Sequence, residues 1–198
     1  MSSSLPLDRM ARMAFVCVFC SSSGRIDEQY LHLATAVGSE LAARGHSLVS
    51  GGGRVSMMGA IARAARAGGA HTLGVIPQAL VPLEVADDDA DELVVTLGMR
   101  ERKAHMDTAA DAFVVLPGGI GTLEELLEIW VARSLGMHSK PIVVCDPTGA
   151  FDHLHALLAH LTETGFVRAE ATAELVWTTT PAEAFDAVEA GLRGLDAG

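Results

Sequence analysis

The sequence predicts an α/β fold: a doubly wound, mainly parallel sheet with helices on both faces, in a single domain spanning 1–198. Apolar, strand-like runs alternate with helix-like segments along the chain, which is the order of elements in a parallel sheet with helical crossovers. The apolar residues are mostly Ala, Val and Leu, and only 5% of residues are aromatic, as in buried parallel strands covered by small-residue helices. We find no internal repeat, linker or second domain.

In the first half of the chain, apolar runs bounded by glycine or proline predict four strands. They lie at 14–20, 46–50, 71–76 and 93–96. Segments with helical spacing of apolar residues lie at 27–44, 55–67 and 99–110. The first of these helices places Tyr30, Val37 and Leu41 on one face and ends before Gly45. Pro77 ends the third strand and begins a predicted loop.

The second half continues the same alternation. Its predicted strands lie at 112–116, 142–145 and 175–178, and its predicted helices at 121–136, 151–164 and 181–193. The helix at 121–136 is the clearest, because Leu123, Leu126 and Trp130 keep helical spacing and Pro117 ends the strand before it. We expect the two ends of the chain, 1–12 and 194–198, to be flexible.

The charge balance excludes several classes of partner. The chain carries 25 acidic and 14 basic residues, a net charge of −11. Such a surface repels phosphodiester backbones and anionic lipid, so we expect no nucleic-acid and no membrane partner. No apolar run approaches the roughly 18 residues of a membrane span. The short run at 13–20 is interpreted as a core strand, not as a signal sequence.

The cysteines and acidic residues do not indicate a metal site. Three cysteines are too few for a disulfide framework, so a reducing, cytoplasmic location is expected. Cys17 and Cys20 form a CxxC pair, but residues three apart on a strand face opposite sides and are poorly placed to bind one metal. The acidic cluster at 87–92 lacks EF-hand spacing and is interpreted as a solvated loop.

The most informative segment is Pro117-Gly118-Gly119-Ile120-Gly121-Thr122-Leu123-Glu124-Glu125, between a strand and an amphipathic helix. Glycines let backbone N–H groups approach an anion, and a helix start favours a phosphate there. Thr122 adds a hydroxyl donor, and Glu125 is close enough to reach the group that is attached to the phosphate. The segment matches neither Walker A nor a complete GxGxxG. The alternative is a tight turn whose acidic residues match the helix dipole.

Two further segments belong to the same argument. A second glycine-rich turn, 50–59, also joins a strand to a helix, so the two turns are expected to hold one phosphorylated ligand from two sides. Its alternative is close helix–strand packing at Gly59. The segment 99–106 places a charged quartet at a helix start, which is usually a solvated face. A guanidinium there can also hold a phosphate or steady a leaving group.

The PGGxGTxxE pattern, the ERKxxM run at 101–106 and the GGG turn with a nearby Met-Gly resemble the LONELY GUY (LOG) family, over about 16–176. This family comprises cytokinin riboside 5′-monophosphate phosphoribohydrolases, long mislabelled lysine decarboxylases. The resemblance implies a Rossmann-like fold and hydrolysis of (N6-prenyl)adenosine 5′-monophosphate to the free base, a cytokinin, and ribose 5-phosphate. It also implies no metal or organic cofactor, and a homodimer or higher oligomer with the site near the subunit interface.

The resemblance assigns site residues as well. Arg102 and Glu125 match the two catalytic positions. The positions that match substrate contacts, or are expected beside them, are Ser22, Gly53, Glu84, Met99, Lys103, Gly118, Gly119, Ile120, Gly121, Thr122, Leu123, Glu124 and Val131. Met99 and Met106 flank Arg102 and are expected to line the base pocket.

These residue types suit cleavage of a C–N bond through a ribosyl cation. A carboxylate near C1′ stabilises the cation and orients water. Arg102 offsets charge on the departing purine. Departures from the plant pattern at Ser21, Ser50, Ile120 and Val131 remove no catalytic group, but they alter the predicted base pocket. Both prenylated AMP and plain AMP therefore remain candidate substrates.

Two other functions compete with hydrolysis. A non-catalytic carrier of a phosphorylated ligand, similar to molybdenum-cofactor carriers, would share the fold. The presence of both Arg102 and Glu125 favours the enzyme over the carrier. A pyridoxal-phosphate decarboxylase would need a Schiff-base lysine, but Lys103 and Lys140 are the only lysines and neither has an obvious pyridoxal context.

Overall fold

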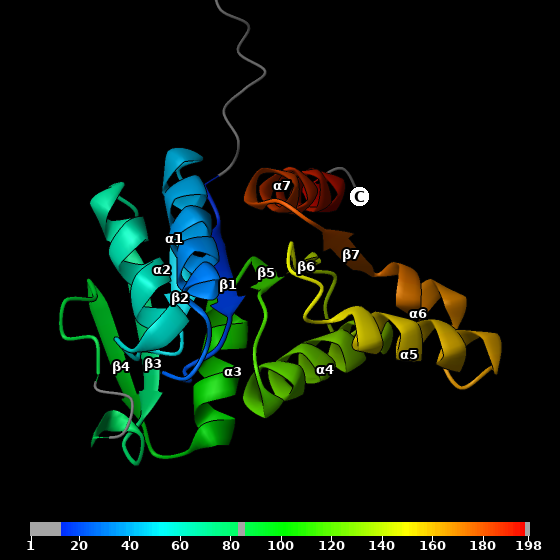
Figure 1. The fold of residues 1–198 in the computed structure, drawn as a ribbon, viewed down its shortest axis with the longest axis horizontal. Helices are drawn as coiled ribbons and strands as arrows, with labels where there is room; N and C mark the ends of the chain where they lie inside the picture. The colour runs from blue at the N-terminus through cyan, green and yellow to red at the C-terminus, as the bar shows by residue number, and fades with distance from the viewer. Residues whose placement is uncertain (1–12, 83–85, 197–198) are drawn as a thin grey trace, which may run out of the picture.

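The computed structural model describes residues 13–82 and 86–196, so the predicted flexible segment 1–12 lies outside it. Within these ranges, the strands form one parallel sheet in the order β4-β3-β2-β1-β5-β6-β7 (Figure 1). They are β1 (Phe15–Phe19), β2 (Ser47–Ser50), β3 (Thr72–Pro77), β4 (Glu92–Thr96), β5 (Ala112–Val115), β6 (Ile142–Cys145) and β7 (Leu175–Thr178). The predicted doubly wound, Rossmann-like sheet is confirmed.

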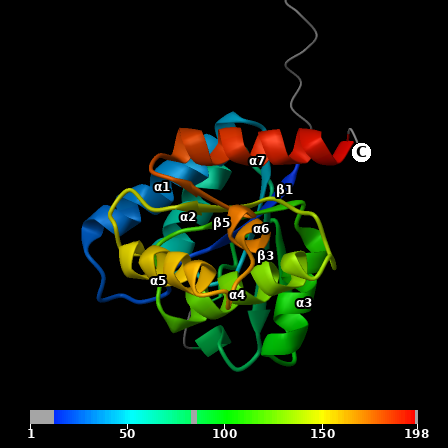
Figure 2. The same cartoon turned by 90° about the vertical axis from the view of Figure 1, so that its right-hand side faces the viewer.

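Helices cover both faces of the sheet (Figure 2). They are α1 (Glu28–Ala43), α2 (Ser56–Ala67), α3 (Met99–Ala109), α4 (Ile120–Ser134), α5 (Asp152–Glu163), α6 (Ala169–Ala173) and α7 (Pro181–Asp196). Helices α1, α2 and α7 pack on one face, and α3, α4, α5 and α6 pack on the other. None of the described helices is long and apolar enough to cross a membrane.

One helix is absent from the prediction, and another extends beyond its predicted end. Helix α6 was not predicted, because five residues are too few to show helical periodicity. Helix α7 continues to Asp196, beyond the predicted end at Arg193. Gly194 resembles a stop signal, but a glycine inside a helix costs only about 1 kcal/mol relative to alanine. The packing of Phe185 and Leu192 against the sheet stabilises the helix around it.

Alternating residues of β1 pack on opposite faces of the sheet. Val16 and Val18 belong to the core under α1, α2 and α7, whereas Cys17 and Phe19 belong to the core under α3 and α4. Cys20, just after the strand, packs with the first group. The two cysteines of the CxxC pair are therefore divided between the two faces, as predicted from their spacing.

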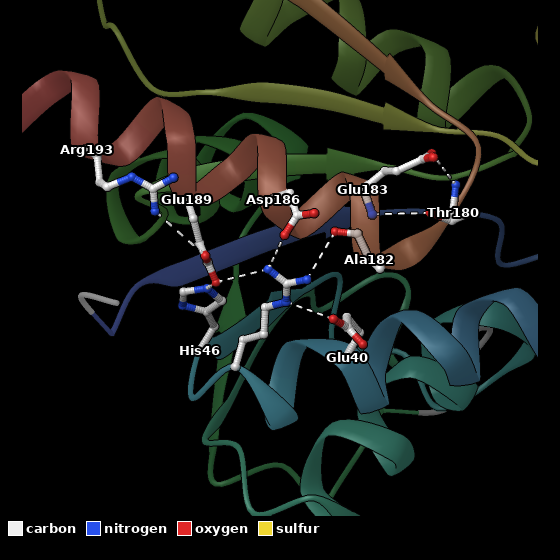
Figure 3. Close-up of polar contacts among 9 residues, drawn as sticks. Glu40, His46, Thr180, Ala182, Glu183, Asp186, Glu189 and Arg193 are labelled. Carbon is white, nitrogen blue, oxygen red and sulfur yellow. Dashed lines mark hydrogen bonds and ion pairs between the residues drawn. The ribbon is translucent and has the colours of Figure 1, made fainter. Parts of the chain in front are cut away.

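A polar network joins α7 to the end of α1 at the amino ends of the strands (Figure 3). Arg44 donates a hydrogen bond of 2.7 Å to Asp186 and lies 3.3 Å from Glu189 Oε1. His46 is buried, with Nδ1 accepting a 3.3 Å hydrogen bond from the Ala14 N–H and Nε2 lying 3.6 Å from Glu189. This network fastens α7 at the end of the sheet opposite the predicted ligand turns.

The strand order reverses between β1 and β5. From β1 the chain builds outward through β2, β3 and β4, and then returns to place β5 on the other side of β1. The loops that follow β1 and β5 therefore diverge, which leaves a crevice beyond the carboxyl ends of the strands. The Gly-rich segment after β5 lies at this crevice.

Candidate active site

A cavity of about 280 Å³ occupies this crevice. Its lining includes the serine loop after β1 at 21–23, the turn after β2 at Gly51, the inner side of α3 and the start of α4. Both predicted methionines, Met99 and Met106, line it as well. Ligands in folds of this kind bind beyond the carboxyl ends of the strands near the reversal of strand order, and the cavity lies at that place.

The start of α4 presents backbone donors to the cavity. Gly119 is the N-cap residue, and no side chain caps the helix. The first helical hydrogen bond joins the Leu123 N–H to the Gly119 carbonyl at 3.0 Å, so the N–H groups before Leu123 have no intrahelical partner. Gly119, Ile120, Gly121 and Thr122 line the cavity. Such a helix start favours an anion.

Gly118 supports this turn without lining the cavity. A Cβ at Gly118 would lie 2.1 Å from Thr122 Oγ1. The missing side chain therefore lets the buried Thr122 pack back onto the turn and keeps the helix start compact.

A buried ion pair lines the same cavity. Arg102, near the start of α3, and Glu125, in α4, are 6% and 8% exposed. Arg102 Nη1 donates to Glu125 Oε1 at 3.2 Å, and Arg102 Nε donates to the Val75 carbonyl at 3.0 Å. Removing two charges from water is costly, and their attraction often does no more than offset it. A buried pair that opens into a cavity therefore points to function more than to stability.

Gly51 makes room for this guanidinium. A Cβ at Gly51 would lie 2.1 Å from Arg102 Nη2 and 2.9 Å from Met58 Sδ. The second glycine-rich turn is thus the surface against which Arg102 packs. Gly51 and Met58 are cavity residues that the site prediction missed, although the GGG pattern already marked the turn.

The serine loop after β1 is held by a strained residue. Ser56, at the start of α2, has φ of 50°, which non-glycine residues rarely adopt. Its hydroxyl donates a 2.6 Å hydrogen bond to the Ser23 carbonyl. Ser22 of this loop was predicted as a contact and lines the cavity. Ser21, a departure from the plant pattern, and Ser23, which no sequence signal distinguished, also line it.

Not every predicted contact lies in the cavity. Leu123 and Val131 line a shallow groove on the outer side of α4. Lys103 does not line the cavity, although Glu124 does; the Lys103 ammonium group contacts Glu124 and lies 2.6 Å from Glu128 Oε2 on α4.

Ala86 and Asp87 are held beside the second glycine turn. Glu84 lies outside the described residues. Gly53 does not line the cavity; it forms a β-bridge with Ala86. Asp87 accepts two hydrogen bonds from Arg66, at 2.8 and 3.1 Å, and is only 4% exposed. The interpretation of 87–92 as wholly solvated is therefore wrong at Asp87, because its carboxylate neutralises a guanidinium under the loop.

Neither lysine suits a pyridoxal site. Lys103 is engaged by two carboxylates, and Lys140 Nζ lies 3.1 Å from Asp107 Oδ1. Neither of them lines the 280 Å³ cavity. In the ranges 13–82 and 86–196, no group of three or more His, Cys, Asp or Glu side chains is arranged to hold a metal ion.

Comparison with known proteins places this chain in a described family. A family model described as possible lysine decarboxylase matches residues 58–188. The chain is 55% identical over 161 residues to the cytokinin riboside 5′-monophosphate phosphoribohydrolase of Mycobacterium marinum, covering 81% of this chain and 86% of that protein. The Mycobacterium tuberculosis protein of the same name is 54% identical with the same coverage. The LOG protein of Oryza sativa subsp. japonica is 39% identical over 89% of this chain and 73% of its own length.

Solved structures share the fold at low sequence identity. The molybdenum cofactor carrier protein of Chlamydomonas reinhardtii has a TM-score of 0.68 at 23% identity, covering 92% of this chain and 99% of that chain. The molybdenum cofactor binding protein of Rippkaea orientalis has a TM-score of 0.69 at 19% identity, covering 90% and 97%. These similarities concern the fold alone.

Proposed function

The chain belongs to the LOG family of cytokinin riboside 5′-monophosphate phosphoribohydrolases, and we propose that it hydrolyses the N-glycosidic bond of (N6-prenyl)adenosine 5′-monophosphate. The products are the free base, a cytokinin, and ribose 5-phosphate. The observation that carries the proposal is the buried Arg102–Glu125 pair in the same cavity as the uncapped start of α4. In this proposal the helix start binds the 5′-phosphate, and the Glu125 carboxylate in the same cavity lies beside the ribose.

The reaction breaks the bond between ribose C1′ and the base nitrogen and adds one water molecule. Hydroxide is added to C1′, and the base nitrogen gains the proton. Glu125 is the general base: its carboxylate stabilises the ribosyl cation and removes a proton from the attacking water. Such general-base help is worth roughly 10²–10⁴-fold. Arg102 orients that carboxylate through Oε1 and offsets negative charge on the departing base.

The 5′-phosphate lies at the start of α4 in this proposal. The N–H groups of 119–122 and the helix dipole supply the attraction, and Thr122 adds its hydroxyl. The phosphate is remote from the broken bond, so its binding energy serves to hold the sugar in register with Glu125.

The assembly proposed is a homodimer formed along the outer groove of α4. Leu127, Val131 and Leu135 are 42%, 51% and 65% exposed on this helix, and Ile120 at its start is 88% exposed. An apolar stripe of this kind, continuous with the cavity through Ile120, suits a second copy of the chain. In such a dimer, Leu123 and Val131 would lie at the subunit interface, beside the partner's copy of the chain. We expect Leu127→Glu to convert the dimer to a monomer in light scattering, whereas Leu157→Glu on α5 leaves it dimeric.

The proposed location is the cytoplasm. Cys17, Cys20 and Cys145 are all buried, and none of the three forms a disulfide. Burial raises the pKa of the Cys145 thiol to about 11 and that of Cys17 well above its ordinary value, so both remain protonated. Buried thiols of this kind suit a reducing compartment.

Release of free base from AMP and from isopentenyladenosine 5′-monophosphate, followed side by side by chromatography, tests the function. Preferential cleavage of the prenylated nucleotide supports cytokinin release, and cleavage of AMP alone identifies a general AMP nucleosidase. If neither is cleaved while ribose 5-phosphate still binds, the hydrolase proposal is wrong and a carrier of a phosphorylated ligand replaces it. We expect Glu125→Gln to abolish release, and Glu170→Gln, on the exposed side of α6, to leave it unchanged.

A further inference from the structure

The two helices that carry the proposed catalytic pair are not packed tightly against each other. A second cavity, of about 420 Å³, lies between α3 and α4. Its lining includes Lys103, Ala104 and Asp107 from α3 and Glu128, Ile129 and Ala132 from α4. Core packing normally fixes the distance between elements, because interiors are dense. Where a cavity takes the place of packed side chains between two helices, the distance between the helices depends on the side chains that bridge the cavity.

Two ionic contacts bridge this gap. The inner contact is the 3.2 Å hydrogen bond between Arg102 and Glu125, which lines the first cavity. The outer contact is made by Lys103, whose ammonium group contacts Glu124 and lies 2.6 Å from Glu128 Oε2. Arg102 and Lys103 are neighbours on α3, and Glu124 and Glu125 are neighbours on α4. The two contacts therefore tie the same short stretches of the two helices together.

The ammonium end of the outer contact is largely shielded from water. The Lys103 side chain is only 15% exposed, whereas both carboxylates are about half exposed. Burial alone would lower the pKa of Lys103, but the hydrogen bonds to Glu124 and Glu128 outweigh it and raise that pKa, so the ammonium stays charged. Because Glu124 and Glu128 are one helical turn apart, a single ammonium group joins both to α3.

We propose that Lys103 is a positioning residue that holds α4 against α3, so that the Glu125 carboxylate stays on Arg102 and at the bond to be cleaved. The proposal rests on the proposed hydrolase function and deepens it. It assigns Lys103 an effect through Glu124 and Glu128 instead of a contact with the nucleotide. A misplacement of about 1 Å in a catalytic group can reduce turnover about 10²-fold.

The kinetic test compares Lys103→Met with Lys103→Arg, Glu128→Gln and the double variant Lys103→Met/Glu128→Gln. We expect Lys103→Met to lower kcat at least about tenfold while KM stays within about threefold, because transition-state contacts are lost and ground-state contacts are not. Lys103→Arg restores most of kcat, since a guanidinium can also bridge two carboxylates. The double variant is no slower than Lys103→Met, since both changes remove one interaction. Arg100→Met, which removes a charge from the same helix, leaves both constants unchanged.

A direct substrate contact would give a different pattern. If Lys103 binds the phosphate, Lys103→Met raises both KM and the inhibition constant of ribose 5-phosphate at unchanged kcat, and its effect multiplies with that of Glu128→Gln. Either result overturns the positioning role. Circular dichroism establishes whether each variant is folded. If Lys103→Met does not fold, the kinetics of Lys103→Arg and Glu128→Gln provide the test instead.

A readout without turnover separates this proposal from the hydrolase function. The Arg102 Nε–H is buried on the Val75 carbonyl, so we expect its NMR signal to be protected from exchange with water in the wild type and in Arg100→Met. In Lys103→Met we expect that protection to fall at least about tenfold. Unchanged protection refutes the positioning role. If the wild-type protein cleaves neither nucleotide but Lys103→Met still shows this loss of protection, the hydrolase function alone is refuted.

Discussion

Replacing Gly51 with alanine adds one methyl group at the point where Arg102 approaches the second glycine turn. The new Cβ would lie 2.1 Å from Arg102 Nη2, and an ordinary contact needs 3.4 Å. The guanidinium therefore has to move by about 1.3 Å, the difference between these two distances. Arg102 Nη1 donates to Glu125 at 3.2 Å, so a shift of that size disrupts the geometry of the hydrogen bond.

The expected loss follows from this displacement. A misplaced catalytic group costs about 10²-fold in turnover for about 1 Å, which corresponds to about 2.7 kcal/mol in activation free energy. The crowding adds about 1–3 kcal/mol of destabilisation, because Met58 also has to move. We expect kcat for base release to fall about 100-fold and the midpoint of urea unfolding to fall with it.

Gly24→Ala is the matched control. Gly24 follows the serine loop, and a Cβ there meets no atom within 4 Å. The same chemical change should therefore leave kcat and stability almost unchanged. A folded Gly51→Ala protein with wild-type kcat would show either that Arg102 accommodates the methyl group without leaving Glu125 or that their contact is unimportant. The assigned role of this pair would then be withdrawn.

Three further predictions concern the scaffold. Asp87→Ala leaves the Arg66 guanidinium without its two hydrogen bonds, so we expect the free energy of unfolding in urea to fall by about 2–3 kcal/mol. A decrease below about 0.5 kcal/mol would contradict the role of Asp87 in anchoring its loop. Trp130→Phe removes a 2.7 Å hydrogen bond to the Ala171 carbonyl and should cost about 1–3 kcal/mol, with protection of α6 amides lost first in hydrogen exchange; uniform protection would refute this. Burial lowers the pKa of His46 below 6.5, so the unfolded state binds the additional proton and stability falls as the pH drops below about 6.5. His46→Gln should flatten this dependence between pH 7.5 and 5.5, and an unchanged slope would exclude His46 as its source.

The order of elements could be predicted from the chain alone, because it depends on local signals. Strand runs such as 112–116 and the amphipathic pattern of α4 are read within a few residues of one another, and both are present in the structure. The Gly-rich segment 117–125 was placed after a strand for the same reason. Helix α6 was missed because so short an element owes its stability to its neighbours, here the hydrogen bond from Trp130.

The arrangement of the cavity depended on contacts between distant segments. Arg102 and Lys103 are adjacent in sequence and were assigned alike, but consecutive helical residues point about 100° apart. One therefore turns inward to the Val75 carbonyl and Glu125, and the other turns across to α4. No local pattern distinguishes these directions.

The sequence by itself thus determined the parallel sheet, the helix start that suits a phosphate and the identity of the charged residues near it. The tertiary structure alone decided which of those residues meet. The crossing of α3 over β3 brings Arg102 against Gly51, and the return of the chain to β5 places Glu125 beside it. The physical reason is that local periodicity fixes which face a residue occupies on its own element, whereas contact between faces depends on how elements far apart in the chain pack together.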